Sequence, residues 1–159
     1  MDITLYKNRG GLPLRNRARF VRMLKEAQDV CGLGGDRGTL QVILLPSQRM
    51  AEMNWAHLKH EGATDVLTFD LRDDSLPVCD PQEVVAEIYV CPEVAVEYAS
   101  AHGLDASREL SLYAIHGMIH LTGQDDIADD DRAEMRRKEA AAFAELEKRG
   151  IRFDGFIQP

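Results

Sequence analysis

Two histidines in a helical stretch, followed by a glycine and two aspartates, constrain this chain more than any other feature. The segment reads His116-Gly-Met-Ile-His120-Leu-Thr-Gly123-Gln-Asp125-Asp126. Side chains four residues apart stack on one face of a helix, so His116 and His120 are expected to point the same way. Glycine adopts the left-handed conformation that ends helices, so the chain can turn back toward the histidines at Gly123.

This turn brings a carboxylate within reach of the two imidazoles. Three protein ligands with one open position are typical of a catalytic metal site. Asp126 stands where zincin-type proteins place their third ligand, and Asp125 would then orient a histidine or a bound water. The two aspartates are adjacent, so spacing alone leaves both assignments open. The alternative is that the histidines hydrogen-bond within the core and the aspartates only cap a turn.

Length and composition place this site in a protein of ordinary size. The chain has 159 residues, which predicts a single domain spanning residues 1–159. No apolar run approaches the ~20 residues that cross a bilayer, and the N-terminus lacks the basic and apolar regions of a signal peptide. Three cysteines without a C-x-x-C spacing favour reduced thiols. We therefore expect a cytoplasmic protein with no membrane partner.

Hydrophobic patterning predicts four strands and about five helices. The strands are expected at 3–6, 40–45, 65–69 and 84–90. The first helix is expected from Pro13 onward, with Leu14, Ala18, Val21 and Leu24 on one face. The second is expected from Ser47 to Leu58 and the third from Pro92 to Gly103. The fourth should begin at an Asp105 cap and contain both histidines, and the fifth should run from an Asp129 cap to Gly150. Residues 110–121 are largely apolar, so the histidine helix should be central and buried.

The charge distribution bears on nucleic-acid binding. A net charge of −8 argues against a protein that grips nucleic acid over a broad surface. The stretch from Lys7 to Lys25 nevertheless contains seven basic residues and no acidic one. Within it, Arg15, Arg19 and Arg22 are expected on one helix face. That face is either an RNA contact or a solvated surface.

The residue after His116 indicates which hydrolytic reaction the site favours. H-E-x-x-H metallopeptidases carry a glutamate there as general base, whereas this chain has Gly117. The absence of that base disfavours peptide hydrolysis. Cleavage of RNA can use the 2′-OH of the substrate as nucleophile and so depends less on a protein base.

Several segments together resemble a known family. H-G-M-I-H-L-T-G-Q-D-D is similar to H-G-x-x-H-L-x-G-x-D-H of the YbeY endoribonucleases, which are bacterial rRNA maturation factors. The likeness extends to Asn54 and the T-D-V-L-T-F run at 64–69, to A-E-I-Y-V at 86–90, and to Met135 with Glu139. The matches cover about residues 40 to 145 in the family's order.

The resemblance implies a single α+β domain, in which a small mixed four-stranded sheet packs with the helices and the metal motif lies on a central helix. It implies one zinc ion per chain on His116, His120 and Asp126, supported by Asp125, and no small-molecule cofactor. The family's third ligand is histidine, whereas this chain has Asp126. A carboxylate is a harder ligand than imidazole, so Mn²⁺ or Mg²⁺ becomes more acceptable.

The resemblance also implies an activity. We expect a metal-dependent, single-strand-specific endoribonuclease of rRNA maturation and ribosome quality control, monomeric, with rRNA and the ribosomal subunit as partners. The family's phosphate-binding arginine corresponds by spacing to Leu58, so Lys59, His60 or the arginines at 15, 19 and 22 would hold the RNA instead. The rival functions are another metallohydrolase, such as a peptidase, and a ribosome-associated RNA-binding protein with a structural metal.

Overall fold

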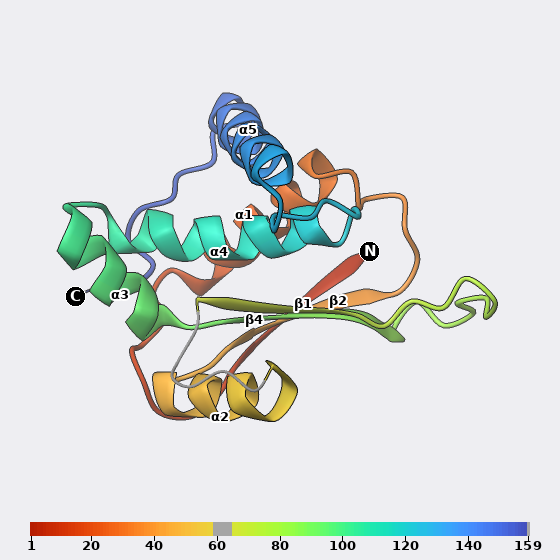
Figure 1. The fold of residues 1–159 in the computed structure, drawn as a ribbon, viewed down its shortest axis with the longest axis horizontal. Coiled ribbons are helices and arrows are strands. Elements are labelled where there is room, and N and C mark those ends of the chain that lie inside the picture. The colour runs from red at the N-terminus through yellow and green to blue at the C-terminus, as the bar shows by residue number, and fades with distance from the viewer. Residues whose placement is uncertain (59–64, 159) are drawn as a thin grey trace.

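A mixed four-stranded sheet forms the base of the fold (Figure 1). The computed structural model describes residues 1–58 and 65–158. The strands are β1 (Asp2–Lys7), β2 (Thr39–Leu44), β3 (Val66–Asp70) and β4 (Val84–Val90), in the order β1-β2-β4-β3. Strands β1, β2 and β4 run parallel, and β3 pairs antiparallel with β4 at the edge. All four predicted strands and the α+β class are confirmed.

Five helices of the described chain cover the two faces of this sheet. Helix α4 (Ala106–His120) lies across one face with α1 (Arg17–Val30) and α5 (Asp129–Lys148), and α3 (Pro92–His102) packs against α4. Helix α2 (Ser47–Leu58) covers the opposite face (Figure 1). The prediction of a central helix that carries both histidines is confirmed, because eleven of the fifteen residues of α4 are buried.

Helix α4 approaches the sheet closely at Gly117. A Cβ atom at this position would lie 2.8 Å from Oγ1 of Thr68 and 2.9 Å from Cγ2 of Ile88, both on the strands below. Such contacts are too short for a side chain, so glycine allows the helix to pack closely against the sheet. The main core lies between these layers, with Ile115 and Met118 fully buried. A smaller cluster around Met50 fills the space under α2.

Helix α1 differs from its prediction. It begins at Arg17 rather than at Pro13, because Asn16 takes a left-handed conformation (φ 52°, ψ 46°) at its N-cap. The predicted apolar face is also wrong: of its four residues only Leu24 is buried. The buried face instead contains Phe20, which meets the ring of Phe156 at 4.9 Å. The C-terminal segment, which carried no predicted element, thus fixes the rotation of this helix.

The predicted caps have different outcomes. Asp105 caps α4 as predicted, since its carboxylate accepts hydrogen bonds from the backbone amides of Ser107 and Arg108. The cap at Asp129 is wrong, because that residue already lies within α5 and Ala128 occupies the N-cap. Ser47, where α2 was predicted to begin, is its first residue, and its hydroxyl donates to the carboxylate of Glu93.

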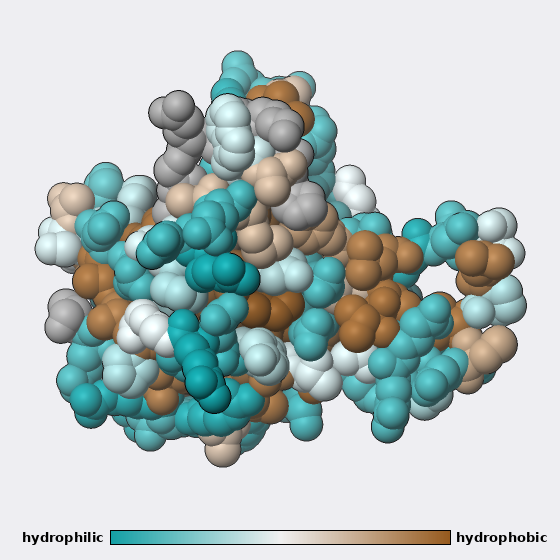
Figure 2. All heavy atoms as spheres, turned by 90° about the horizontal axis from the view of Figure 1, so that it is seen from below, coloured by the Kyte–Doolittle hydropathy of each residue, from teal (hydrophilic) through white to brown (hydrophobic). Residues whose placement is uncertain are grey.

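An acidic loop leaves one end of the sheet between β3 and β4 (Figure 1). Seen from below, hydrophobic atoms gather at the end of the sheet from which this loop extends (Figure 2). The exposed large apolar residues of the loop and its flanks are Leu71, Leu76 and Val84. Within the described residues no helix combines the length and apolar character that a membrane span requires.

Candidate metal centre

The two histidines of α4 direct their Nε2 atoms toward one point. The Nε2 atoms of His116 and His120 lie 3.0 Å apart, and the rings are nearly perpendicular, at 84°. The helix produces this arrangement by itself, because residues i and i+4 share a face. Both rings are largely buried, with side-chain exposures of 13% and 27%, so their positions are set by packing as well as by the backbone.

Asp126 completes the group from the loop that follows the helix. Gly123, at φ 97°, ends the helical turn and lets the chain reverse. One carboxylate oxygen of Asp126, Oδ2, then lies 3.2 Å from Nε2 of His116 and 3.4 Å from Nε2 of His120. The three residues together can hold a metal ion, since one ligand atom from each lies within 4.8 Å of the others.

Asp125 lies outside this group. Its side chain is exposed, and its Oδ1 accepts a hydrogen bond of 2.7 Å from the backbone amide of Asp126. It therefore shapes the loop that presents Asp126, and no contact with a histidine is found within the described residues. The fold thus separates the two aspartates that spacing alone left equivalent.

The opposite nitrogens of the two rings are held by acceptors. Nδ1 of His116 donates to the carboxylate of Glu139 at 2.7 Å, and Nδ1 of His120 donates to the backbone carbonyl of Gln124 at 2.8 Å. Because a carboxylate and a carbonyl only accept, both Nδ1 atoms carry the proton, and a neutral ring then has its lone pair on Nε2. Arg136 in turn binds Glu139 at 2.5 Å.

These contacts test whether a metal fits. With neutral rings, two imidazole lone pairs and one carboxylate oxygen converge within 3.4 Å, and three acceptors so close repel one another. A positive charge at their centre removes that repulsion. Two imidazole nitrogens and one carboxylate oxygen also suit Zn²⁺ and other divalent transition metals. The donor set therefore fits the implied metal.

Sequence reasoning missed the roles of the supporting residues. Glu139 was part of the recognised motif, but nothing in its position showed that it would reach His116 from another helix. The exposed fraction of its side chain is only 6%, which is rare for glutamate unless it is paired. The Gln124 contact comes from a backbone carbonyl, so no side-chain pattern could have indicated it.

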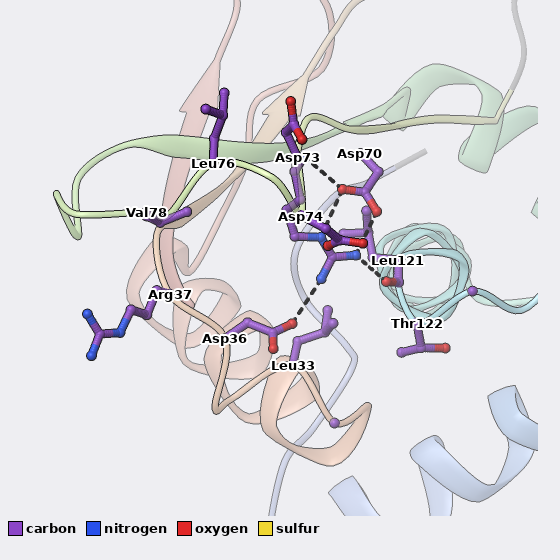
Figure 3. A pocket seen from close by; sticks show the side chains of 13 residues that line it. Leu33, Asp36, Arg37, Asp70, Asp73, Asp74, Leu76, Val78, Leu121 and Thr122 are labelled. Atoms are coloured by element: carbon purple, nitrogen blue, oxygen red, sulfur yellow. Dashed lines mark hydrogen bonds and ion pairs between the residues drawn. The ribbon is translucent and has the colours of Figure 1, made fainter.

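Asp36, Asp70 and the chain at Leu121 come together beside the acidic loop (Figure 3), and Arg72 binds all three. Its guanidinium donates to the carbonyl of Leu121, just beyond the helix, and forms ion pairs with Asp70 at 2.7 Å and Asp36 at 2.9 Å. The hydrogen bond from Arg72 lowers the pKa of Asp70. The cavity of about 780 Å³ around this arginine is also lined by Asp73 and Asp74, so its acidity does not suit phosphate.

One of the three arginines of the predicted basic face is engaged by the protein itself. Arg15 precedes α1, and Arg19 pairs with Asp154 and lies over the ring of Phe156 at 4.7 Å. Arg19 therefore binds the C-terminal segment, whereas Arg22 is exposed. None of the three belongs to the metal group. Lys59 and His60, the other predicted RNA contacts, lie outside the described residues.

Comparisons with known proteins identify related sequences. A sequence model of the family "Endoribonuclease YbeY" matches residues 7–147. A Protochlamydia amoebophila protein named endoribonuclease YbeY is 29% identical over 109 residues, 69% of this chain and 71% of that protein. Proteins of the same name from Frankia casuarinae and Staphylococcus aureus are 32% and 33% identical; the matches cover 80% and 63% of this chain and 64% and 67% of theirs.

A solved structure supports the fold. The solution structure of a Thermotoga maritima protein superposes with a TM-score of 0.58 at 21% identity, over 92% of this chain and 93% of the other. At that identity the likeness concerns the fold alone. The family match, in contrast, includes the whole segment from His116 to Asp126. The chain therefore belongs to the endoribonuclease YbeY family.

Proposed function

We propose that this protein is a metal-dependent endoribonuclease that cleaves single-stranded RNA during rRNA maturation and ribosome quality control. The observation that carries the proposal is the convergence of two Nε2 atoms and one carboxylate oxygen in a partly exposed site. A divalent metal held there would supply positive charge for the scissile phosphate and lower the pKa of a water. Zinc is our first assignment, and Mn²⁺ or Mg²⁺ is the alternative that Asp126 admits.

The protein's own residues have separate tasks in this proposal. His116, His120 and Asp126 bind the metal. Glu139 and the carbonyl of Gln124 orient the imidazoles and keep the proton on Nδ1, so the metal-facing nitrogens stay unprotonated. Asp125 supports the loop of Asp126.

RNA binding is a second point at which the chain departs from the family pattern, after the third metal ligand. The position of the family's arginine is Leu58, the last residue of α2. Lys59 and His60 follow it directly in sequence and remain our candidates for phosphate contact, together with Arg15 and Arg22. We further propose that the protein acts as a monomer in the cytoplasm on rRNA or a ribosomal subunit.

The position of Gly117 argues against the peptidase alternative. A side chain there would project into Thr68 and Ile88 of the sheet, at 2.8 and 2.9 Å from the first carbon. A glutamate at this position therefore has no room in this fold. The metallopeptidase base is missing from the sequence, and the packing of α4 explains why.

Metal analysis combined with an RNA assay tests the proposal. Purified wild type should contain about one divalent metal per chain and cleave single-stranded rRNA fragments, and a chelator should abolish both. We expect Asp126→Ala to lose most of its metal and Asp125→Ala to keep it. Cleavage of a peptide library without cleavage of RNA would overturn the proposal. Full RNA cleavage by metal-free protein would exclude metal dependence.

His116→Ala separates the enzyme from the binding-protein alternative. If the metal supports catalysis, the variant should stay folded by circular dichroism, lose metal and lose RNA cleavage. If the metal is structural, the variant should unfold and the wild type should show no cleavage at all.

A further inference from the structure

A second cavity lies between the first half of α4 and the middle of α5. Its volume is about 320 Å³, within the size range of small-ligand sites. Leu112 and Phe143 contribute apolar walls, and Arg108 and Arg136 line it as well. Three acidic residues, Asp105, Glu109 and Glu139, complete its polar lining.

One carboxylate oxygen of a residue that lines this cavity has no hydrogen-bond partner within the described residues. Glu109 lines the cavity, yet the residue is only 7% exposed. Its Oε2 atom is buried and has no hydrogen-bond partner within the described residues. Burial raises the pKa of Glu109, and the nearby charges of Asp65 and Glu139 raise it further. A buried acceptor without a donor is unusual in a folded protein, so this carboxylate would gain from a donor that reaches it.

The cavity is close to the metal centre through shared residues. Glu109, Leu112 and His116 follow one another at spacings of three and four, so they lie on one face of α4. Glu139 lines the cavity and also accepts the hydrogen bond from His116. A ligand here would be separated from a metal ligand by a single side chain.

The planar groups beside Glu109 suit a flat ligand. The guanidinium of Arg108 lies over the ring of Phe143, with its central carbon 4.2 Å from the ring centre. Proteins that read single-stranded RNA stack unpaired bases on aromatic rings and guanidinium planes, and they bind the base edges by hydrogen bonds. An ionised carboxylate accepts only, so it selects bases by their N–H groups.

We propose that this cavity binds a nucleobase of the RNA substrate beside the cleavage site, with Glu109 accepting hydrogen bonds from its edge and guanine preferred. Guanine offers two neighbouring N–H donors, whereas the single N–H of uracil lies between two carbonyl oxygens that a carboxylate repels. The inference rests on the proposed nuclease function and names a base specificity for it.

Nucleotide binding tests the cavity without relying on catalysis. Calorimetric titration of the metal-loaded protein with guanosine and uridine monophosphates should show tighter binding of the guanosine nucleotide. Glu109→Gln should reduce that affinity about tenfold and leave the uridine nucleotide unchanged. Glu134→Gln is the matched control, since Glu134 is on α5, pairs with Arg137 and does not line the cavity. If Glu109→Gln misfolds, Leu112→Trp should block the same binding by filling the cavity.

A cleavage assay then separates the two proposals. In a uridine strand with one guanosine, wild type should cut next to the guanosine, and Glu109→Gln should cut without positional preference at unchanged metal content. Cleavage by wild type without preference, or equal affinity for both nucleotides, would overturn the cavity proposal and leave the nuclease intact. Glu109-dependent guanosine binding without any RNA cleavage would support the cavity and overturn the nuclease.

Discussion

The Glu139–His116 hydrogen bond provides the sharpest test of the metal centre. Glu139 never reaches the metal position itself, but it fixes the ring of His116 through Nδ1 at 2.7 Å. Its side chain is 6% exposed, so solvent screens this contact little. Loss of such a supporting carboxylate typically lowers metal affinity by a factor of about 10 to 100, or about 1.4 to 2.8 kcal/mol.

Two substitutions of Glu139 should weaken metal affinity by amounts at opposite ends of that range. Glu139→Gln keeps the shape and one accepting oxygen but loses the negative charge, so we expect about a tenfold weaker affinity for zinc. Glu139→Ala removes the acceptor altogether and leaves Nδ1 buried without a partner, so we expect about a hundredfold. Arg136 loses its ion pair in both variants, but its side chain is 63% exposed and solvent replaces the partner.

Competition with a chromophoric chelator measures these affinities directly. Glu134→Gln is a close control, because Glu134 also pairs with an arginine three residues away on α5 but makes no contact with the histidines within the described residues. The control should bind zinc as the wild type does. An unchanged zinc affinity in Glu139→Ala would refute the reasoning, since His116 would then either not ligate or not need its support.

Three further predictions concern stability. Gly117→Ala should lower the free energy of unfolding by about 1 to 3 kcal/mol, because the new methyl group overpacks the contact between α4 and the sheet. Arg72→Met should lower it by about 2 kcal/mol, because Leu121 and two carboxylates lose a charged donor. Because the pKa of Glu109 is raised, the wild type should lose stability relative to Glu109→Gln as pH rises.

Urea denaturation measures all three. Arg49→Met, which removes an exposed ion pair on α2, is the control for Arg72 and should change stability by less than about 0.5 kcal/mol. A neutral Gly117→Ala would mean that α4 does not lie against the sheet as described. For Glu109 the direction of the pH effect follows from the raised pKa, because folding favours the protonated carboxyl. Its contribution to the free energy of unfolding is therefore present below the ordinary pKa of glutamate and is lost as pH rises through the raised pKa of the folded protein. Parallel pH profiles of the two proteins would contradict it.

Elements governed by local patterns could be predicted from the sequence. Helix α2 and strand β4 have the predicted bounds, because Pro46, Ser47 and an alternating apolar run mark them locally. Helix α1 could not be placed correctly. Its start depends on the left-handed Asn16, whose amide donates to the carbonyl of Gly155 from the far end of the chain. That contact spans 139 residues and leaves no local signal.

The same division holds within the metal centre. His116, His120 and Asp126 lie within eleven residues, so helix periodicity and one glycine sufficed to group them. Glu139 is 23 residues from His116, and the hydrogen bond of Arg72 to Leu121 spans 49. Such partners are determined by how helices and loops pack, which residue spacing does not encode. The choice between Asp125 and Asp126 also required the folded loop.

The division of the ligands between a helix and a loop has a kinetic consequence. Two of the three candidate ligands stand on a largely buried helix, whereas Asp126 stands on a loop of mostly exposed residues that should open more readily. A bound metal can therefore leave after a local opening of residues 122–128 alone. Its exchange rate should follow the hydrogen-exchange rate of the amides in this loop and remain far faster than global unfolding. The metal centre would then exchange its ion within an intact fold.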